Sequence, residues 1–258
     1  MRWRYINTGE NDGKFNMAFD LLLAKNCKPD EVYLRFYRWK PFCISLGANQ
    51  NIKSIKIDKA ASDGIDIVIR PTGGRAILHS EELTYSVVMP LQQTSSVKNI
   101  YYEINLALAE GLKNYDALLS NIKLEYEQPN FSSFYKEEKS AVCFAVSAKN
   151  ELKFSGKKLV GSAQRKLNNV VLQHGSILCG SYHKKIVDYL TLSEKGFYNL
   201  KEDMDKFTID LKSILNKKIN YQNLISSLLT GFSNHFACEF NNFDLEEINI
   251  FENEVNNF

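Results

Sequence analysis

The 258-residue sequence predicts an α+β protein in which a largely antiparallel mixed sheet is flanked by helices. Up to about residue 178, short runs rich in β-branched and aromatic residues alternate with turn signals, as the strands of such a sheet do. Segments with helical spacing interrupt these runs and dominate the remainder of the chain. The length suffices for a sizeable core, and we expect residues 1–258 to form a single domain.

Helix and strand patterns alternate in the first half of the chain. The spacing predicts helices over 16–25, 52–62 and 96–115. Asn11 or Asp12 is the expected N-cap of the first helix. The expected strands cover 32–39, 43–47, 65–70 and 83–90. The tetrapeptide PTGG at 71–74 is typical of a turn.

The second half begins with a polar, loop-like stretch from Glu127 to Ser140. Residues 151–178 then predict three strands, with SGK and LNN as their turns. From about 182 to 258 the chain is rich in Lys and Asn and is expected to be mostly helical, with 225–236 as its clearest amphipathic segment.

Composition narrows the functional class. Hydrophobic residues make up 44% and charged residues 24%, as in ordinary soluble proteins. Lys and Arg total 32 against 30 Asp and Glu, and this balance indicates neither nucleic acid nor a membrane surface as a partner. The polar start MRWRYINTGE lacks a signal-peptide core, and no apolar run reaches transmembrane length. We therefore expect a cytoplasmic protein.

A glycine pair between two arginines is the first candidate for chemistry. Gly73 and Gly74 let the backbone approach a ligand closely, and Arg70 and Arg75 can hold an acidic group or a phosphate. A tight loop with two exposed arginines explains the same residues. His79 follows, and a structural hydrogen-bonding role is at least as good an interpretation of it as a direct one.

Small residues within a strand form the second candidate. Gly161, Ser162 and Ala163 would leave a trough for a ligand chain, and Lys158 precedes them by three positions. Because side chains alternate between the faces of a strand, Lys157 is expected to point away from Lys158. A plain hairpin with a lysine-rich turn is the alternative.

Five cysteines without a close pair argue against a disulfide framework and against a zinc site. Cys143 differs from the others because a polar loop precedes it and the strand that carries Lys158 follows it. A nearby lysine stabilises a thiolate, the reactive form of the group. The remaining cysteines are interpreted as small buried hydrophobes: Cys27, Cys43, Cys179 and Cys238.

In combination and order, these segments resemble the lipoate–biotin protein ligase superfamily, and within it the octanoyltransferases that act on the glycine-cleavage H protein. The matching segments are NMAFD, RPTGGRAILHSEELTYS, the cysteine of AVCF, GKKLVGSAQ and LQHGSI, which span roughly residues 16 to 178. The resemblance implies the catalytic-domain fold of the biotin and lipoate protein ligases.

Two positions favour the transferase branch. The ligases that use ATP have a third glycine where Arg75 stands, and they lack a cysteine at the position of Cys143. The resembled transferases pair a cysteine with a lysine, and the matching residues are Cys143 and Lys158, 15 positions apart (158 − 143). The sequence CFAVS lacks the proline that this branch often carries, and the Gly-Arg-Gly-Arg signature of biotin ligases is absent.

The resemblance implies a transfer through a thioester. Octanoyl from octanoyl-acyl carrier protein would pass to Cys143 and then to a lysine of a lipoyl carrier domain, such as H protein or a dehydrogenase E2 subunit, in lipoate biosynthesis. Lys158 would lower the pKa of Cys143 and relay a proton. No cofactor and no metal are expected. The implied substrate-binding residues are Arg70, Thr72, Gly73, Gly74, Arg75, His79, Gly161, Ser162, Ala163, Gln164, His174 and Gly175.

Other functions remain open from the sequence. An ATP- and Mg-dependent lipoate ligase or an octanoyl amidotransferase would use the same fold, and ATP dependence identifies the ligase. A non-catalytic acyl-carrier-binding or lipoate-binding protein would bind without turnover. A cysteine hydrolase would need a histidine partner, for which His174 is the only nearby downstream candidate.

Overall fold

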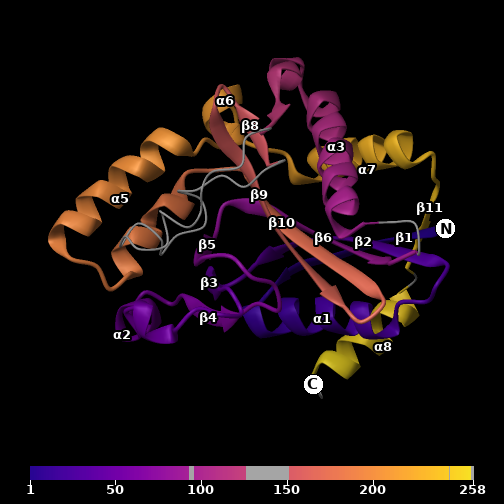
Figure 1. Ribbon diagram of the computed structural model, residues 1–258, viewed down its shortest axis with the longest axis horizontal. Coiled ribbons are helices and arrows are strands. Elements are labelled where there is room, and N and C mark those ends of the chain that lie inside the picture. The colour runs from indigo at the N-terminus through magenta and orange to yellow at the C-terminus, as the bar shows by residue number, and fades with distance from the viewer. Residues whose placement is uncertain (93–95, 126–150, 244, 257–258) are drawn as a thin grey trace.

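The computed structural model describes residues 1–92, 96–125, 151–243 and 245–256. Within them, the chain forms a large sheet of strand order β11-β1-β2-β6-β10-β9-β8-β7 and a small sheet of order β4-β3-β5 (Figure 1). The large sheet contains β1 (Arg2–Asn11), β2 (Glu31–Trp39), β6 (Glu82–Pro90), β7 (Lys123–Leu124), β8 (Leu152–Phe154), β9 (Lys157–Leu167), β10 (Val170–Leu178) and β11 (Phe240–Asn242). The small sheet contains β3 (Cys43–Leu46), β4 (Asp66–Ile69) and β5 (Ile77–His79).

The pairing confirms the expected mixed, largely antiparallel sheet. From β2 through β6, β10, β9 and β8 to β7, every neighbouring pair of strands is antiparallel. The first strand, β1, runs parallel to both β2 and β11. The sequence did not predict β1 or β5, whereas the three strands expected over 151–178 are present as β8, β9 and β10.

The structure has helices where the sequence predicts the longer ones. The helical elements are α1 (Gly13–Asn26), η1 (Ile52–Ser54), α2 (Ile57–Ser62), α3 (Val97–Tyr115), η2 (Ala117–Asn121), η4 (Tyr182–Tyr189), α5 (Glu194–Phe207), α6 (Leu211–Leu215), α7 (Tyr221–Phe236) and α8 (Leu245–Asn256). Asp12 caps α1 by accepting from the backbone N–H of Phe15. The expected helix over 52–62 is wrong as a single element, because Ile55 is buried and forms a β-bridge with Leu190, which separates η1 from α2.

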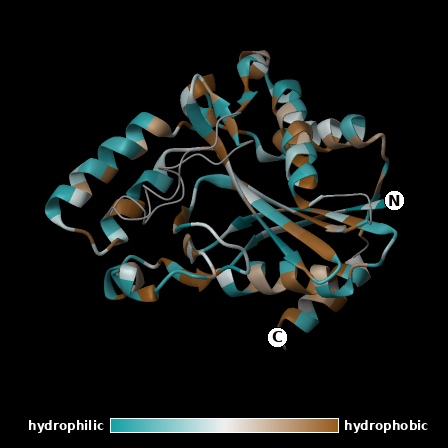
Figure 2. Ribbon diagram, viewed as in Figure 1, coloured by the Kyte–Doolittle hydropathy of each residue, from teal (hydrophilic) through white to brown (hydrophobic). Residues whose placement is uncertain are grey.

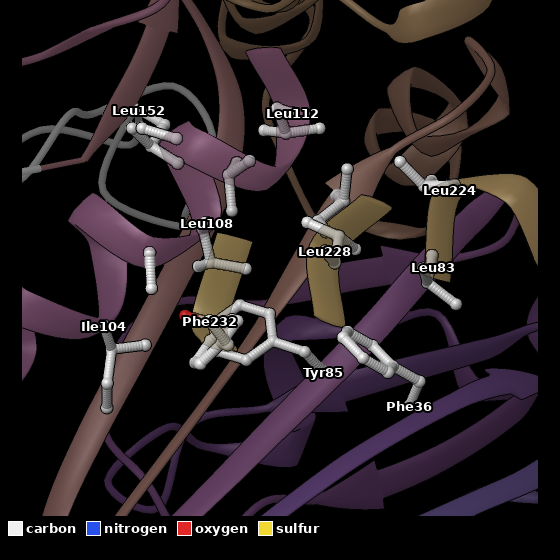
Figure 3. Close-up of a cluster of buried hydrophobic side chains, with 14 of the residues drawn as sticks. Phe36, Leu83, Tyr85, Ile104, Leu108, Leu112, Leu152, Leu224, Leu228 and Phe232 are labelled. Carbon is white, nitrogen blue, oxygen red and sulfur yellow. The ribbon is translucent and has the colours of Figure 1, made fainter. Parts of the chain in front are cut away.

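One core lies between the large sheet and the α3–α7 pair (Figures 2 and 3). Phe36 and Tyr85 rise from the sheet and meet side chains such as Leu108 and Phe232 from the two helices. On the opposite face, α1 and α8 cover the sheet, and the small sheet lies beside α1 (Figure 1). This second face carries the pocket described below. No helix in the described part of the chain has the length and apolar character to cross a membrane.

Candidate functional site

A pocket lies between the large sheet and the small sheet. Its wall combines four strands of the large sheet, two of the small sheet, α1 and the residue that follows β4. The lining residues are Met17, Tyr37, Trp39, Ser45, Arg70, Ile77, His79, Thr84, Gly161, Ser162, Ala163, His174, Gly175 and Ser176.

The trough expected from the small residues of β9 forms part of this wall. Gly175 on β10 pairs with Ser162 and contributes the facing side. A Cβ atom at Gly175 would lie 2.6 Å from the carbonyl oxygen of Gly161 and 2.8 Å from Oγ of Ser162. Only glycine therefore fits at this position, and its absent side chain allows the two strands and Tyr85 to meet at the pocket.

Arg70 holds the glycine turn together instead of standing exposed. Its guanidinium donates to the carbonyl oxygens of Gly73, Arg75 and Ser45, and to Oγ of Ser45. The residue is 3% exposed. These bonds engage all five N–H donors of the arginine. Hence the interpretation of an ordinary loop with two exposed arginines does not hold for Arg70.

The turn also packs against the end of β3. A Cβ atom at Gly47 would lie 2.1 Å from the carbonyl oxygen of Gly74, so the backbones of the two glycine segments are in contact. Gly74 adopts φ of 95°, a conformation that favours glycine. Gly73 and Gly74 are exposed and Arg75 is half-buried, outside the lining of the pocket.

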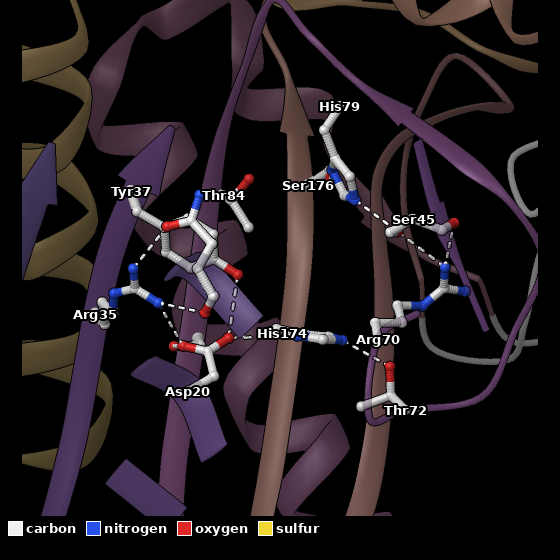
Figure 4. Close-up of polar contacts among 12 residues, drawn as sticks. Asp20, Arg35, Tyr37, Ser45, Arg70, Thr72, His79, Thr84, His174 and Ser176 are labelled. Atoms are coloured by element: carbon white, nitrogen blue, oxygen red, sulfur yellow. Dashed lines mark hydrogen bonds and ion pairs between the residues drawn. The ribbon is translucent and has the colours of Figure 1, made fainter. Parts of the chain in front are cut away.

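A buried ionic cluster lies behind the pocket, where α1 meets the sheet (Figure 4). Oδ1 of Asp20 accepts from Nη1 of Arg35 at 2.8 Å and from Oγ of Ser86 at 2.7 Å. Both members of the ion pair have fully buried side chains. Burial by itself raises the pKa of Asp20, but Arg35 and His174 hold it below its ordinary value. The carboxylate is therefore charged and compensated.

A chain of contacts leads from this cluster to the glycine turn. Nδ1 of His174 lies 3.5 Å from Oδ2 of Asp20, and its Nε2 lies 2.6 Å from Oγ1 of Thr72. Burial lowers the pKa of His174, although Asp20 opposes this effect. The imidazole is therefore neutral near pH 7.

A second histidine forms a parallel arrangement on the small sheet. Nδ1 of His79 lies 2.8 Å from Oε1 of Glu82, and Nε2 lies 2.7 Å from Oγ of Ser45. Thr84 and Ser176 also donate to Oε1 of Glu82. Burial raises the pKa of Glu82, but His79 and these hydroxyls bring it below its ordinary value.

The chemistry of the pocket follows from these contacts. The polar atoms of its wall are bonded to one another, and the ring of His79 stacks on Trp39 with centroids 4.0 Å apart. The surfaces that remain for a ligand are ring faces, methyl groups and the thioether side chain of Met17. Such a wall accepts an apolar chain, because a polar ligand would find few unsatisfied partners.

Lys158 stands beside the pocket wall but does not line it. Its side chain is fully buried, and Nζ lies 2.8 Å from Oε1 of Glu151. Lys157 is half-buried and donates to the carbonyl oxygen of Asp205. The two neighbouring lysines thus occupy different environments, as the alternation of side chains predicts.

The structure brings together seven of the residues expected from the sequence. Those that line the pocket are Arg70, His79, Gly161, Ser162, Ala163, His174 and Gly175. Thr72 contacts it through His174. Gln164 lies elsewhere, donating to Oε1 of Gln173. Cys143 and the loop over 127–140 lie outside the described residues.

Several residues of the site were not identified from the sequence. These are Met17, Asp20, Tyr37, Trp39, Ser45, Ile77, Glu82, Thr84 and Ser176. Asp20 did carry a signal, because it is a carboxylate within an apolar helical segment. In the part of the chain that the structure describes, no group of three or more His, Cys, Asp or Glu side chains is arranged to hold a metal ion.

Two curated proteins resemble this chain over most of its length. The octanoyltransferase LipM of Staphylococcus aureus is 33% identical over 261 residues, which cover 98% of this chain and 93% of that protein. The octanoyltransferase LipM of Bacillus subtilis is 31% identical over 254 residues, covering 95% and 90%.

Solved structures show the same fold. A putative lipoate protein ligase of T. acidophilum with bound lipoic acid gives a TM-score of 0.76 at 19% identity, covering 100% of this chain and 95% of that chain. A lipoate-protein ligase A bound with ATP gives 0.76 at 17% identity, covering 99% and 95%. The expected catalytic-domain fold is therefore confirmed. Residues 12–233 match the model of the lipoyl protein ligase A/B catalytic domain, and the chain belongs to this family.

Proposed function

We propose that this protein is an octanoyltransferase of lipoate biosynthesis, which delivers an octanoyl group to a lysine of a lipoyl carrier domain. The observation that carries the proposal is the pocket between the sheets, whose polar side chains bond to one another and leave an apolar wall. A saturated acyl chain gains about 0.8 kcal/mol per methylene from leaving water, and it demands no hydrogen bonds in return. Relatives over most of the chain carry the name octanoyltransferase.

The proposed chemistry is an exchange of thioesters followed by formation of an amide. The thiolate of Cys143 attacks the carbonyl carbon of octanoyl-acyl carrier protein, the bond from that carbon to the carrier sulfur breaks, and the carrier leaves as a thiolate. The amine of the acceptor lysine then attacks the Cys143 thioester. The carbon–nitrogen bond forms, the carbon–sulfur bond breaks, and the amine loses a proton. The first step replaces one thioester with another of similar energy, and the second replaces a thioester with a more stable amide. The transfer therefore consumes no nucleotide.

Lys158 is the proposed partner of Cys143. Its ammonium would stabilise the thiolate, and in the second step it would relay the proton that the attacking amine sheds. The position of Lys158 supports this role, because the residue lies three positions from Gly161 in the pocket wall and its side chain is excluded from bulk water.

The proposed acceptors are the lipoyl domains of glycine-cleavage H protein or of dehydrogenase E2 subunits. A solved bi-partite lipoate protein ligase from Thermoplasma acidophilum, described together with its E2 lipoyl domain, shares the fold with a TM-score of 0.76 at 18% identity. Its coverage is 99% of this chain and 92% of that chain. The lipoyl domain named with that ligase supports a lipoyl domain as the acceptor of this protein.

Intact-protein mass spectrometry tests the proposal. The purified protein is incubated with octanoyl-acyl carrier protein in the absence of ATP, and H protein is added afterwards. We expect one octanoyl group on the enzyme, lost on treatment with hydroxylamine and absent in Cys143→Ala, and then one octanoyl group on H protein. Transfer that requires ATP and persists in Cys143→Ala would identify a ligase instead.

A further inference from the structure

Glu151 and Lys158 form a buried ion pair at the start of β9. Oε1 of Glu151 lies 2.8 Å from Nζ of Lys158, and the two side chains are 2% and 0% exposed. A buried pair gains little net stability, because removing both charges from water costs several kcal/mol per ion. The pair therefore calls for an explanation in terms of what the charge does there.

The local backbone aims Lys158 into this environment. Ser155 and Gly156 turn the chain with φ of 49° and 78°, as in a tight hairpin. Beyond the turn, Lys153 pairs with Lys158 while Leu152 pairs with Val160, so Leu159 is an extra residue on β9. A bulge of this kind redirects neighbouring side chains, and such bulges are common beside active sites.

A buried tyrosine links the surroundings of Glu151 to the pocket wall. Burial, with a further contribution from the Glu151 charge, raises the pKa of Tyr85 to about 12. The Tyr85 hydroxyl lies 2.7 Å from Oγ of Ser162, which lines the pocket. Tyr85 therefore feels the Glu151 charge and also bonds to a residue of the pocket wall.

We propose that Glu151 is a positioning residue for the acyl transfer, whose carboxylate keeps the Lys158 ammonium charged and fixed beside the pocket. The inference rests on the proposed role of Lys158. In a dry interior, a lysine without a nearby negative charge loses its proton readily. A neutral amine does not stabilise a thiolate, so removal of the Glu151 charge would disable Lys158 without altering its side chain.

Other titratable groups lie on the elements that pack against this end of β9. They are Lys153 on β8, Tyr85 on β6, His183 on η4, Asp205 on α5 and Asp210 before α6. Among these groups, Lys153 forms an ion pair with Glu125. Nε2 of His183 lies 3.0 Å from Oγ1 of Thr208. The Lys153–Glu125 pair is a matched reference, because Lys153 belongs to the same hairpin as Lys158 and both side chains of the pair are about one-fifth exposed.

The test compares Glu151→Gln with Glu125→Gln. The first readout is the rate at which the enzyme acquires octanoyl, measured from pH 6 to pH 9. We expect Glu151→Gln to slow acylation about tenfold near pH 7 and to recover toward pH 9, where the thiolate forms unaided. Glu125→Gln should retain the wild-type profile. A purely structural role of Glu151 would lower the amount of folded enzyme without moving the pH profile.

The second readout does not depend on activity. Lysine side-chain NMR follows the titration of each ammonium, and Lys158→Arg identifies the signal of Lys158. Its titration midpoint should fall in Glu151→Gln and stay unchanged in Glu125→Gln. A wild-type enzyme that never becomes acylated would refute the proposed function alone, whereas an unchanged Lys158 midpoint would refute the inference alone.

A double variant keeps the inference testable if Glu151→Gln does not fold. Glu151→Gln combined with Lys158→Met leaves no unpaired charge from this ion pair. Its pH profile for acylation should match that of Lys158→Met by itself, because Glu151 acts through Lys158. Any additional shift caused by Glu151→Gln in the Lys158→Met background would overturn the proposal.

Discussion

Nδ1 of His174 and Oδ2 of Asp20 lie 3.5 Å apart, and this contact joins the middle of β10 to α1. The other ring nitrogen of His174 lies 2.6 Å from Thr72 in the glycine turn. Three segments that are far apart in the sequence therefore meet through one imidazole. The Asp20 cluster that holds the fold together also positions one wall of the pocket.

Asp20→Asn should destabilise the protein strongly. The substitution preserves shape but removes the negative charge that compensates Arg35, whose side chain is fully buried. Breaking a buried ion pair by neutralising one partner costs about 3–5 kcal/mol. Urea unfolding followed by circular dichroism measures the loss. The control is Glu10→Gln, which removes an ion pair with Arg38 in which both side chains are about one-third exposed, and which should cost under about 1 kcal/mol. Equal losses in the two variants would contradict this account.

Gly175→Ala should destabilise the protein, whereas Gly73→Ala should not. A Cβ atom at Gly175 meets backbone and side-chain atoms at 2.6 to 2.8 Å, while one at Gly73 meets nothing within 4 Å. Overpacking of this kind costs typically about 1–3 kcal/mol. Thermal unfolding of the two variants provides the comparison. The steric argument fails if Gly175→Ala melts at the wild-type temperature.

Much of the fold could be predicted from local patterns, and the exceptions have physical causes. The apolar spacing locates α3, and the two turns locate β8, β9 and β10. In contrast, the sequence of β1 has a polar character, because Trp3 and Ile6 are buried on opposite faces while most of the residues around them are only half-buried. A strand of three residues such as β5 is too short to show an alternation of apolar and polar residues.

Ala163→Leu should change the preference for acyl-chain length. Ala163 lines the pocket, and a larger side chain there occupies space that the acyl chain would fill. Each methylene left in water forfeits about 0.8 kcal/mol, or roughly fourfold in affinity. The ratio of kcat/KM for octanoyl over butanoyl donors should fall at least about tenfold. The same exchange at exposed Ala61 on α2 should leave the ratio unchanged. An unaltered ratio in Ala163→Leu would mean that the acyl chain lies elsewhere.

His183 should make the protein less stable in mild acid. Burial lowers the pKa of His183 from its ordinary value of 6.5 to about 4. Between these values the unfolded chain binds a proton that the folded chain does not, so the free energy of unfolding decreases as pH falls. His183 should lower the free energy of unfolding by about 2 kcal/mol between pH 7 and pH 5.

The variant His183→Gln isolates this effect, because glutamine can still bond to Thr208 but does not titrate. Urea unfolding at pH 7 and pH 5 should show a smaller loss of stability in the variant than in the wild type. The pKa of buried His174 is also lowered, and its contribution remains in both proteins. Identical pH dependence in the two proteins would exclude His183 as a source.

The candidate site was only partly predictable, for reasons of distance along the chain. The glycine turn and the β9 trough have composition signals of their own, and both reach the pocket region. Ser45, Trp39 and Ser176 give no such signal, because each becomes part of the site only when strands from distant segments come together. Conversely, Gln164 was assigned with its neighbours of the GSAQ run, but it does not line the pocket and instead donates to Oε1 of Gln173.

Alkylation should separate Cys143 from the other cysteines. Burial raises the pKa of Cys27 to about 12 and that of Cys238 to about 11. Burial also raises the pKa of Cys43 and Cys179 above the ordinary value. At pH 7 a thiol of pKa 11 is ionised in roughly one molecule in 10⁴, whereas an unperturbed cysteine is ionised in a few per cent. Because only the thiolate reacts, these four cysteines should be modified slowly by iodoacetamide.

If Cys143 is the proposed nucleophile, it should account for the fast phase of modification in the folded protein. Cys143→Ala should remove that phase. Cys238→Ala, which changes the cysteine with the lowest pKa of the four, should leave it intact.

Lys158→Met should slow the fast phase at pH 7, because removing a nearby cation raises the pKa of a thiol. At higher pH the fast phase should return in this variant. Lys158→Arg retains the charge but sheds its proton far less readily, so it should preserve fast alkylation while impairing transfer to the acceptor amine. Peptide mapping after brief exposure to iodoacetamide gives the rates site by site. A fast phase that survives in Cys143→Ala, or one that Lys158→Met leaves unchanged at every pH, would show that the reactive thiol and its partner had been assigned wrongly.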